Sequence, residues 1–434
     1  MKIAIKKWAK LDGATRDALL ERPSVADDDG IRATTAAVIA KVRAGGDTAL
    51  RALTLQFDGA DIGDLRVSKG EIAAAVAQLS PEQLAAIDLA IANVRRFHEK
   101  QRPTGIRVET MPGVVCERVS HALDAVGLYV PAGTAPLPSA AIMLAVPAAI
   151  AGCPTRILCT PPQSNGEANA AVVAAASRAG ITDIYKVGGA QAIAAMAYGT
   201  ESIPKVCKIF GPGNAWVTSA KTLVSIDAYG AAIDMPAGPS EVMVIADDTA
   251  VAEFVASDLL SQAEHGSDSQ VVLVTTSAAL AGDVNVAIEK QLARLSRAAI
   301  ASLALENSRI FLVDDLDTAV ALSNQYAPEH LILQISEPRN VLPQLRNAGS
   351  VFLGPWTPES VGDYCSGTNH VLPTYGFART YSGLGVDQFM RQMTIQELSR
   401  EGLEGISSAV LSLAGMEGLD AHAAAVTIRL REPA

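Results

Sequence analysis

A glutamine, a glutamate and a histidine stand within four consecutive positions of the stretch SQAEHGSDSQ, residues 261–270. The run before it, VAEFVASDLL, has the spacing of an amphipathic helix, so Gln262 and His265 would share one face of its last turn. An amide oxygen and an imidazole nitrogen suit Zn²⁺ or Mn²⁺ rather than a thiolate-type structural site. Two ligands are not enough, which makes Asp363 and His422 candidates for the others. On spacing alone, a solvated helix end remains the commoner explanation.

A second pair of residues able to do chemistry, Glu329 and His330, follows Pro328 in the stretch YAPEHLI. The pair lies between a predicted helix and the predicted strand LILQI. An imidazole that titrates near neutrality suits general-base catalysis, and a neighbouring carboxylate can orient it or activate water. A Glu–His pair on the protein surface is the commoner alternative and stays open at this point.

Three glycine-bearing turns stand at the ends of predicted strands, in GLYVPAGTAPLPSA, KVGGAQAIAAMAYGT and KIFGPGNAWVTSAK. Such turns let the backbone approach a phosphate, while the following helix offers its amide donors. Tyr129, Gln191 and Asn214 sit at or just past these strand ends, where they could contact a ribose or a nicotinamide amide. None of the turns is a complete GxGxxG, so glycines that merely cap helices are the alternative.

The elements that must position these residues alternate between strands and helices. Residues 1 to about 100 have mostly helical spacing; short β-rich runs then alternate with alanine-rich helical runs, and a second alternating stretch runs from SQVVLVTTS to SVFLG. Such alternation is typical of βαβ units on parallel sheets. We therefore predict an α/β protein with two Rossmann-like lobes and helical N- and C-terminal arms.

The composition narrows the class of protein. Of 434 residues, 49% are hydrophobic and 19% charged, enough to bury the cores of more than one lobe. A net charge of −11 without a Lys/Arg block argues against nucleic acid or an anionic membrane as the main partner. The N-terminus lacks the apolar core of a signal peptide, and five scattered cysteines fit reduced thiols, so we expect a cytoplasmic protein.

The longest motifs resemble those of the histidinol dehydrogenase family, from about Arg22 to Arg431. They are VGLYVPAG, VGGAQAIAAMAYGTESIPK, IFGPGNAWVTSAK, GAAIDMPAGPSEVMVIAD, FVASDLLSQAEHG, NQYAPEHLI, SVFLGPW, PESVGDYCSGTNHVLPTYG and MTIQELS. The resemblance implies oxidation of L-histidinol to L-histidine through bound L-histidinal, with two NAD⁺, in the last steps of histidine biosynthesis. It also implies one zinc ion per subunit and a homodimer with shared active sites.

The resemblance assigns roles to individual residues. It implies zinc ligands at Gln262, His265, Asp363 and His422 of the partner subunit, and NAD contacts at Tyr129, Gln191 and Asn214. It implies that His330 is the base for the hydroxyl proton and that Glu329 activates water in the second oxidation. The implied substrate contacts are His330, the zinc ligands, Ser240 and His370. Glu417 of the partner subunit is a further implied contact.

The expected domain organisation follows from these roles. We expect an N-terminal arm over 1–25 and a first α/β lobe over 26–128 and 239–380 that carries the metal and catalytic residues. A second lobe over 129–238 would bind NAD, and a helical arm over 381–434 would reach the partner subunit.

Other functions remain to be weighed against this one. A related zinc and NAD dehydrogenase of another small polar alcohol, such as a sulfonated diol, would be expected to alter the residues on the imidazole side, yet His370 and Glu417 are both present. A zinc hydrolase using Glu329 as its base would leave the three glycine turns without a purpose. A metal-binding scaffold without catalysis would not need the Glu329–His330 pair.

Overall fold

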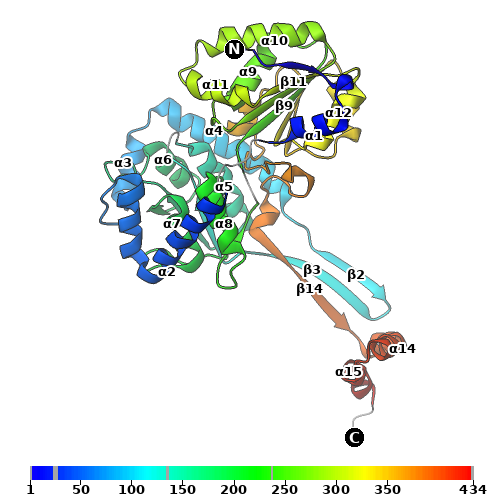
Figure 1. The fold of residues 1–434 in the computed structure, drawn as a ribbon. Coiled ribbons are helices and arrows are strands. Elements are labelled where there is room, and N and C mark those ends of the chain that lie inside the picture. Colours follow the sequence, from blue (N-terminus) through cyan, green and yellow to red (C-terminus); the bar gives the residue numbers. More distant parts are fainter. Residues whose placement is uncertain (1, 23–27, 133–135, 236–237, 432–434) are drawn as a thin grey trace.

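The computed structural model describes residues 2–22, 28–132, 136–235 and 238–431, which form two α/β lobes and a projecting arm (Figure 1). Each lobe contains one sheet in which all strand pairs are parallel. The strand orders are β1-β11-β10-β9-β12-β13 in the first lobe and β6-β5-β4-β7-β8 in the second. The predicted α/β class with two parallel sheets is thus confirmed.

The sheet of the first lobe is covered by helices on both faces. Its strands are β1 (Ile5–Lys7), β9 (Glu241–Ala246), β10 (Gln270–Thr275), β11 (Arg309–Leu312), β12 (His330–Gln334) and β13 (Ser350–Leu353). Its helices are α1 (Gly13–Leu20), α9 (Ala252–Ala263), α10 (Ala278–Leu292), α11 (Ala298–Glu306), α12 (Leu316–Tyr326) and α13 (Glu359–Tyr364).

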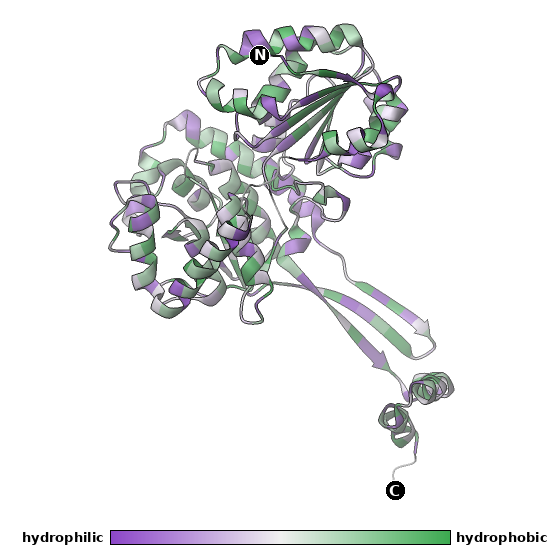
Figure 2. Ribbon diagram, viewed as in Figure 1, coloured by the Kyte–Doolittle hydropathy of each residue, from purple (hydrophilic) through white to green (hydrophobic). Residues whose placement is uncertain are grey.

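Alternate residues of one strand show how this sheet is buried. Val242 and Val244 of β9 pack with α9, α10 and α11, whereas Met243 and Ile245 pack with α12 and Trp8 on the opposite face. Every residue of β9, β10 and β12 is buried, as expected for a parallel sheet between two helical layers. Figure 2 shows the corresponding apolar colouring of the strands inside this lobe.

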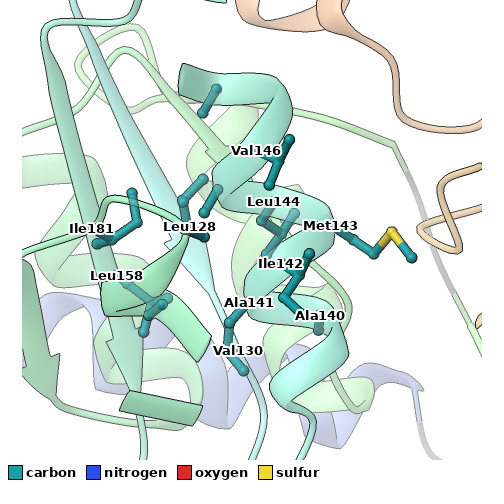
Figure 3. Packing of buried hydrophobic residues seen from close by; sticks show 14 of the residues in the cluster. Leu128, Val130, Ala140, Ala141, Ile142, Met143, Leu144, Val146, Leu158 and Ile181 are labelled. Carbon is teal, nitrogen blue, oxygen red and sulfur yellow. The ribbon is translucent and has the colours of Figure 1, made fainter. Parts of the chain in front are cut away.

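The second lobe follows the same plan. Its strands are β4 (Ala125–Tyr129), β5 (Thr155–Thr160), β6 (Asp183–Lys186), β7 (Lys208–Phe210) and β8 (Ala232–Ile233). The helices between them are α5 (Pro138–Ala151), α6 (Ala170–Arg178), α7 (Gly189–Tyr198) and α8 (Ala215–Ser225). In Figure 3, apolar side chains of α5 lie beside Leu128 and Val130, and the same cluster includes Leu158 and Ile181. The many alanines let these helices approach the sheet closely.

Three N-terminal helices differ from the predicted division of the chain. They are α2 (Asp28–Asp58), which is kinked at Gly46, α3 (Lys69–Ala77) and α4 (Pro81–His98), and the prediction assigned them to the first lobe. Instead α2 packs on α7 and α8, α3 on α6, and α4 on α5. Their apolar faces, with Val42 and Leu50 in one cluster and Val94 in another, fill the core of the second lobe.

The N-terminal segment is part of the first lobe and not the separate arm that was predicted. Strand β1 pairs in parallel with β11, so residues 5–7 form an edge of the first sheet. The predicted boundary at residue 25 lies outside the described residues, as does Gly133 of the first glycine turn. Short 3₁₀ helices complete the chain: η1 (Trp8–Lys10), η2 (Glu99–Gln101), η3 (Pro338–Gln344), η4 (Phe377–Arg379) and η5 (Val386–Phe389).

The arm is an antiparallel sheet that ends in two helices (Figure 1). Strands β2 (Ile106–Met111), β3 (Val114–Ala122) and β14 (Met390–Leu398) are ordered β14-β3-β2. Helices α14 (Arg400–Glu417) and α15 (Asp420–Leu430) lie at its tip. The sequence predicted the helices but not the strands. None of the described helices combines the length and apolar character needed to cross a membrane.

A stability prediction concerns Asp58, the last residue of α2. One of its carboxylate oxygens is buried without a hydrogen-bond partner among the described residues, and burial raises its pKa from 3.8 to about 6. Because the folded pKa exceeds the unfolded one, the ionised carboxylate destabilises the fold progressively above about pH 4, and fully above about pH 6.

We expect Asp58→Asn to raise the free energy of unfolding by roughly 1–2 kcal/mol at pH 8, after allowance for solvent screening, and by much less at pH 4. Urea unfolding at both pH values measures this difference, with the exposed Asp61→Asn as the control. An equal change at the two pH values would show that the Asp58 charge is not the cause.

Candidate active site

Glu329 and His330 form a buried pair where α12 gives way to β12. Helix α12 ends at Tyr326, Ala327 adopts a left-handed conformation with φ 55°, and Pro328 prevents the helix from continuing. Glu329 is 6% exposed and His330 is 4% exposed, so the alternative of a surface Glu–His pair is wrong.

The backbone of Glu241, the first residue of β9, orients both side chains. Its N–H donates to Oε2 of Glu329 at 2.9 Å, and its carbonyl oxygen lies 3.2 Å from Nδ1 of His330. When Nδ1 carries the proton it donates to that carbonyl, which leaves Nε2 as the proton acceptor. Nε2 is buried without a hydrogen-bond partner among the described residues, 3.7 Å from Oδ1 of Asp363.

Burial and nearby carboxylates shift the two pKa values. Burial alone favours a neutral His330, but the carboxylates of Glu359, Glu329 and Asp363 stabilise its charged form and raise its pKa to about 10. Loss of hydration raises the pKa of Glu329 to about 8, although His330 opposes the shift. A cation among these carboxylates would lower both pKa values toward neutrality, where the two groups can act as bases.

Helices α9 and α13 bring a group of metal-type ligands to the same place. Ligand atoms of His265, Glu359 and Asp363 all lie within 4.8 Å of one another. Gln262 is fully buried, and the amide orientation that satisfies its hydrogen bonds places its nitrogen 2.5 and 3.2 Å from the two carboxylate oxygens of Glu359 and 3.2 Å from Nδ1 of His330. The structure therefore brings three of the four sequence-predicted ligands, Gln262, His265 and Asp363, into one cluster.

Sequence reasoning missed Glu359, a member of this cluster, and Asp258, whose carboxylate lies near enough to raise the pKa of Glu359. Glu359 is 1% exposed and Asp258 is 3% exposed. Each lies four residues before a predicted ligand, Glu359 before Asp363 on α13 and Asp258 before Gln262 on α9. This spacing puts each pair on one helix face, a signal that could have identified both residues.

The donor set fits a divalent cation. An imidazole, an amide and carboxylates are the ligands that Zn²⁺ and Mn²⁺ accept, and the group contains no thiol. Ionised carboxylates are rarely buried without a partner of opposite charge. His370 lies against the same site, with Nδ1 2.8 Å from the carbonyl oxygen of Asp363.

The remaining predicted substrate residues divide into two groups. Ser240 directly precedes Glu241 at the edge of the sheet where His330 lies. Glu417 ends α14 and His422 lies on α15, both exposed, at the far tip of the arm (Figure 1). A single chain therefore does not bring Glu417 or His422 to the cluster.

The predicted NAD residues gather at one edge of the second lobe. Tyr129 ends β4, Gln191 is in the first turn of α7, and Asn214 caps α8. The Tyr129 hydroxyl accepts from the Gly189 N–H at 3.0 Å, and Oδ1 of Asn214 accepts from the Val217 N–H at 3.2 Å. Both side chains thus also stabilise the turns, and two helix N-termini lie beside them.

The predicted site residues of the two lobes lie at opposite edges of the two sheets. The second lobe presents the carboxyl ends of β4, β6 and β7, the usual ligand-binding edge of a parallel sheet. In the first lobe Glu329, His330 and Ser240 stand at the amino ends of β12 and β9. The rule that ligands bind at the carboxyl ends of parallel strands therefore predicts the position of the candidate residues in the second lobe. It does not predict the position of Glu329, His330 and Ser240 in the first lobe.

The fold and the site define a two-lobed α/β enzyme of the dehydrogenase class, with nucleotide-type turns in one lobe and a buried glutamate–histidine pair in the other. The chain belongs to the histidinol dehydrogenase family. Its residues 21–430 match the family model described as histidinol dehydrogenase, which confirms the resemblance and the class of NAD-dependent oxidoreductases.

Individual relatives agree over almost the whole chain. Histidinol dehydrogenase of Vibrio vulnificus (strain YJ016) is 56% identical over 425 residues, 98% of each chain. That of Xanthomonas axonopodis pv. citri (strain 306) is 54% identical over 426 residues, 98% of this chain and 99% of the relative. The crystal structure of histidinol dehydrogenase from Elizabethkingia anophelis matches with a TM-score of 0.95 at 45% identity, over 99% of this chain and 98% of that one.

The missed carboxylate Glu359 offers a test of the metal site. We expect Glu359→Gln to weaken Zn²⁺ binding about 10- to 100-fold, because the change removes a negative charge and replaces one of the two acceptor oxygens that face Gln262 by a donor. Competition with a chromophoric chelator measures the affinity. Glu264→Gln, beside His265 but outside the cluster, is the control. Equal losses in the two variants would mean that Glu359 has no specific role in holding the ion.

Proposed function

We propose that this chain oxidises L-histidinol to L-histidine through bound L-histidinal, as the names of its relatives indicate for the family. The observation that carries the proposal is the buried Glu329–His330 pair, with His330 3.7 Å from Asp363 of the metal-type cluster. A cytoplasmic location fits a reaction on small, polar metabolites. The comparisons give no support to a sulfonated-diol dehydrogenase or to a zinc hydrolase.

Zinc is the proposed metal, one ion per subunit. Gln262, His265 and Asp363 would hold it together with His422 of the partner subunit, and the ion would anchor the substrate through its imidazole and amino nitrogens. Nitrogen and oxygen ligands of these types suit Zn²⁺. Ser240 and His370 of the same chain, and Glu417 of the partner subunit, would contact the substrate as well.

Each oxidation must remove a proton from a different oxygen, which accounts for two bases. Nε2 of His330, whose Nδ1 lies against the Glu241 carbonyl, is free to take the proton of the substrate hydroxyl in the first step. Glu329, held by the Glu241 N–H, would take a proton from the water that attacks the aldehyde. The burial of both bases protects the bound aldehyde from side reactions.

NAD⁺ is the proposed hydride acceptor, with the second lobe as its binding domain. Tyr129, Gln191 and Asn214 stand at the edge where the N-termini of α7 and α8 offer amide donors for the phosphates. In the chain, β8 of this lobe is followed by Ser240 and β9 of the first lobe.

The exposed arm supports the proposal of a homodimer with shared active sites. Both faces of its sheet are exposed in the single chain, and they carry Ile106, Val108, Met393 and Ile395 as exposed apolar residues. A three-stranded sheet with exposed apolar faces needs a covering partner. A second copy that exchanges its arm would cover the sheet and deliver Glu417 and His422 to the site that lacks them.

The reaction has a defined yield of reduced cofactor. The protein with L-histidinol should form two NADH for each histidine, because both oxidations occur on one bound molecule. Absorbance of NADH together with chromatographic quantification of histidine gives the ratio. One NADH with free aldehyde as the product, or turnover without NAD⁺, would contradict the proposed function.

Subunit mixing tests the shared site. A heterodimer of one His422→Ala chain and one His330→Ala chain should retain about half of the wild-type activity, because one of its sites keeps both histidines. Differently tagged chains allow the heterodimer to be purified before it is assayed, and each homodimeric variant is the control. Verified heterodimers no more active than those controls would mean that His422 acts within its own chain.

A further inference from the structure

Arg22 joins parts of the first lobe that meet beside the active site. It follows α1, and its side chain is only 11% exposed. Its Nε and Nη2 donate to the two carboxylate oxygens of Glu241, at 2.7 and 3.1 Å. Nη2 also donates to the carbonyl oxygens of Tyr326 at 2.7 Å and of Ala327 at 3.3 Å. One guanidinium thus links the start of β9 to the end of α12.

The carboxylate that Arg22 holds belongs to the residue that orients both bases. The N–H of Glu241 donates to Glu329 at 2.9 Å, and its carbonyl lies 3.2 Å from Nδ1 of His330. A displacement of Glu241 would therefore move the hydrogen-bond partners of both bases together.

The turn that precedes the bases needs support from its surroundings. Ala327 has φ 55°, a left-handed conformation that is unfavourable for a residue with a side chain. Its carbonyl and that of Tyr326 lie at the end of α12, where helical acceptors need outside donors. Arg22 supplies these donors, and its guanidinium also lies over the Tyr326 ring, 3.8 Å from the centroid.

We propose that Arg22 is a positioning residue, which holds the Glu329–His330 turn in register with Ser240 and Glu241 without touching the substrate itself. This inference rests on the proposed function, in which both residues of the turn act as bases. A lysine would keep the charge, but its single ammonium cannot reproduce the planar, two-pronged contact with Glu241.

Arg16 provides a matched control on the same N-terminal segment. Its Nη2 donates to the Trp8 carbonyl at 3.0 Å, and its guanidinium lies 5.0 Å from the centroid of the Trp8 ring. Arg16 thus makes a carbonyl contact and a ring contact like those of Arg22, but its described contacts include neither Glu241 nor α12.

The experiment compares Arg22→Met, Arg22→Lys and Arg16→Met in the full-length, metal-loaded protein. For Arg22→Met we expect kcat to fall about 100-fold, the loss typical of misplaced catalytic groups, and the KM for NAD⁺ to stay within about threefold. Amide hydrogen exchange should accelerate only in peptides covering 238–246 and 324–334. Arg22→Lys should lose about tenfold less than Arg22→Met, and Arg16→Met should leave kcat and the exchange of these peptides unchanged.

Two results would overturn the inference. One is an equal loss of kcat in Arg22→Met and Arg16→Met; the other is faster exchange in the Arg22 variants without a loss of kcat. If Arg22→Met does not fold, the comparison of Arg22→Lys with Arg16→Met decides in the same way. A wild-type protein that forms no NADH from histidinol contradicts the proposed function instead, and the local exchange rates alone then decide whether Arg22 holds the turn.

Discussion

The concentration of negative charge around one buried imidazole is the constraint on which the site depends. Glu329, Glu359 and Asp363 each lie within 4 Å of a ring nitrogen of His330, and the first two are almost completely removed from water. One imidazolium cannot balance three carboxylates in an environment of low polarity. The cluster therefore requires either shared protons or a cation, and its ligand types favour a divalent metal ion.

The carboxylates lie close to His330 because the ends of several helices and strands meet there. Helix α9 brings Gln262, and α13 brings Glu359 and Asp363, to the same place, where β12 begins with His330. Close approach is possible because two positions lack side chains. A Cβ at Gly349 would lie 2.6 Å from the Glu329 carbonyl oxygen, and one at Gly362 would lie 2.6 Å from the Phe352 ring.

Local patterns in the sequence predicted much of this arrangement and failed where distant segments meet. The spacing of Gln262 and His265 and the motif around Glu329 predicted groups that the structure does bring together. The helical periodicity of α2 predicted that it has an apolar face. It did not predict that α7 and α8 cover this face, because these helices lie far along the chain. Strand β14 was missed because its apolar residues, Met390, Met393, Ile395 and Leu398, are spaced by three, two and three positions and so lack the regular alternation that marks a strand.

We propose that a metal ion neutralises this cluster and that a second subunit completes its coordination. Diffraction at the zinc absorption edge from crystals of active, metal-loaded protein tests both parts at once. We expect one anomalous peak per subunit, bonded to Gln262, His265 and Asp363 and to His422 of the partner subunit. No peak at the cluster, or an ion held only by residues of one chain with Glu359 as the fourth ligand, would contradict the account.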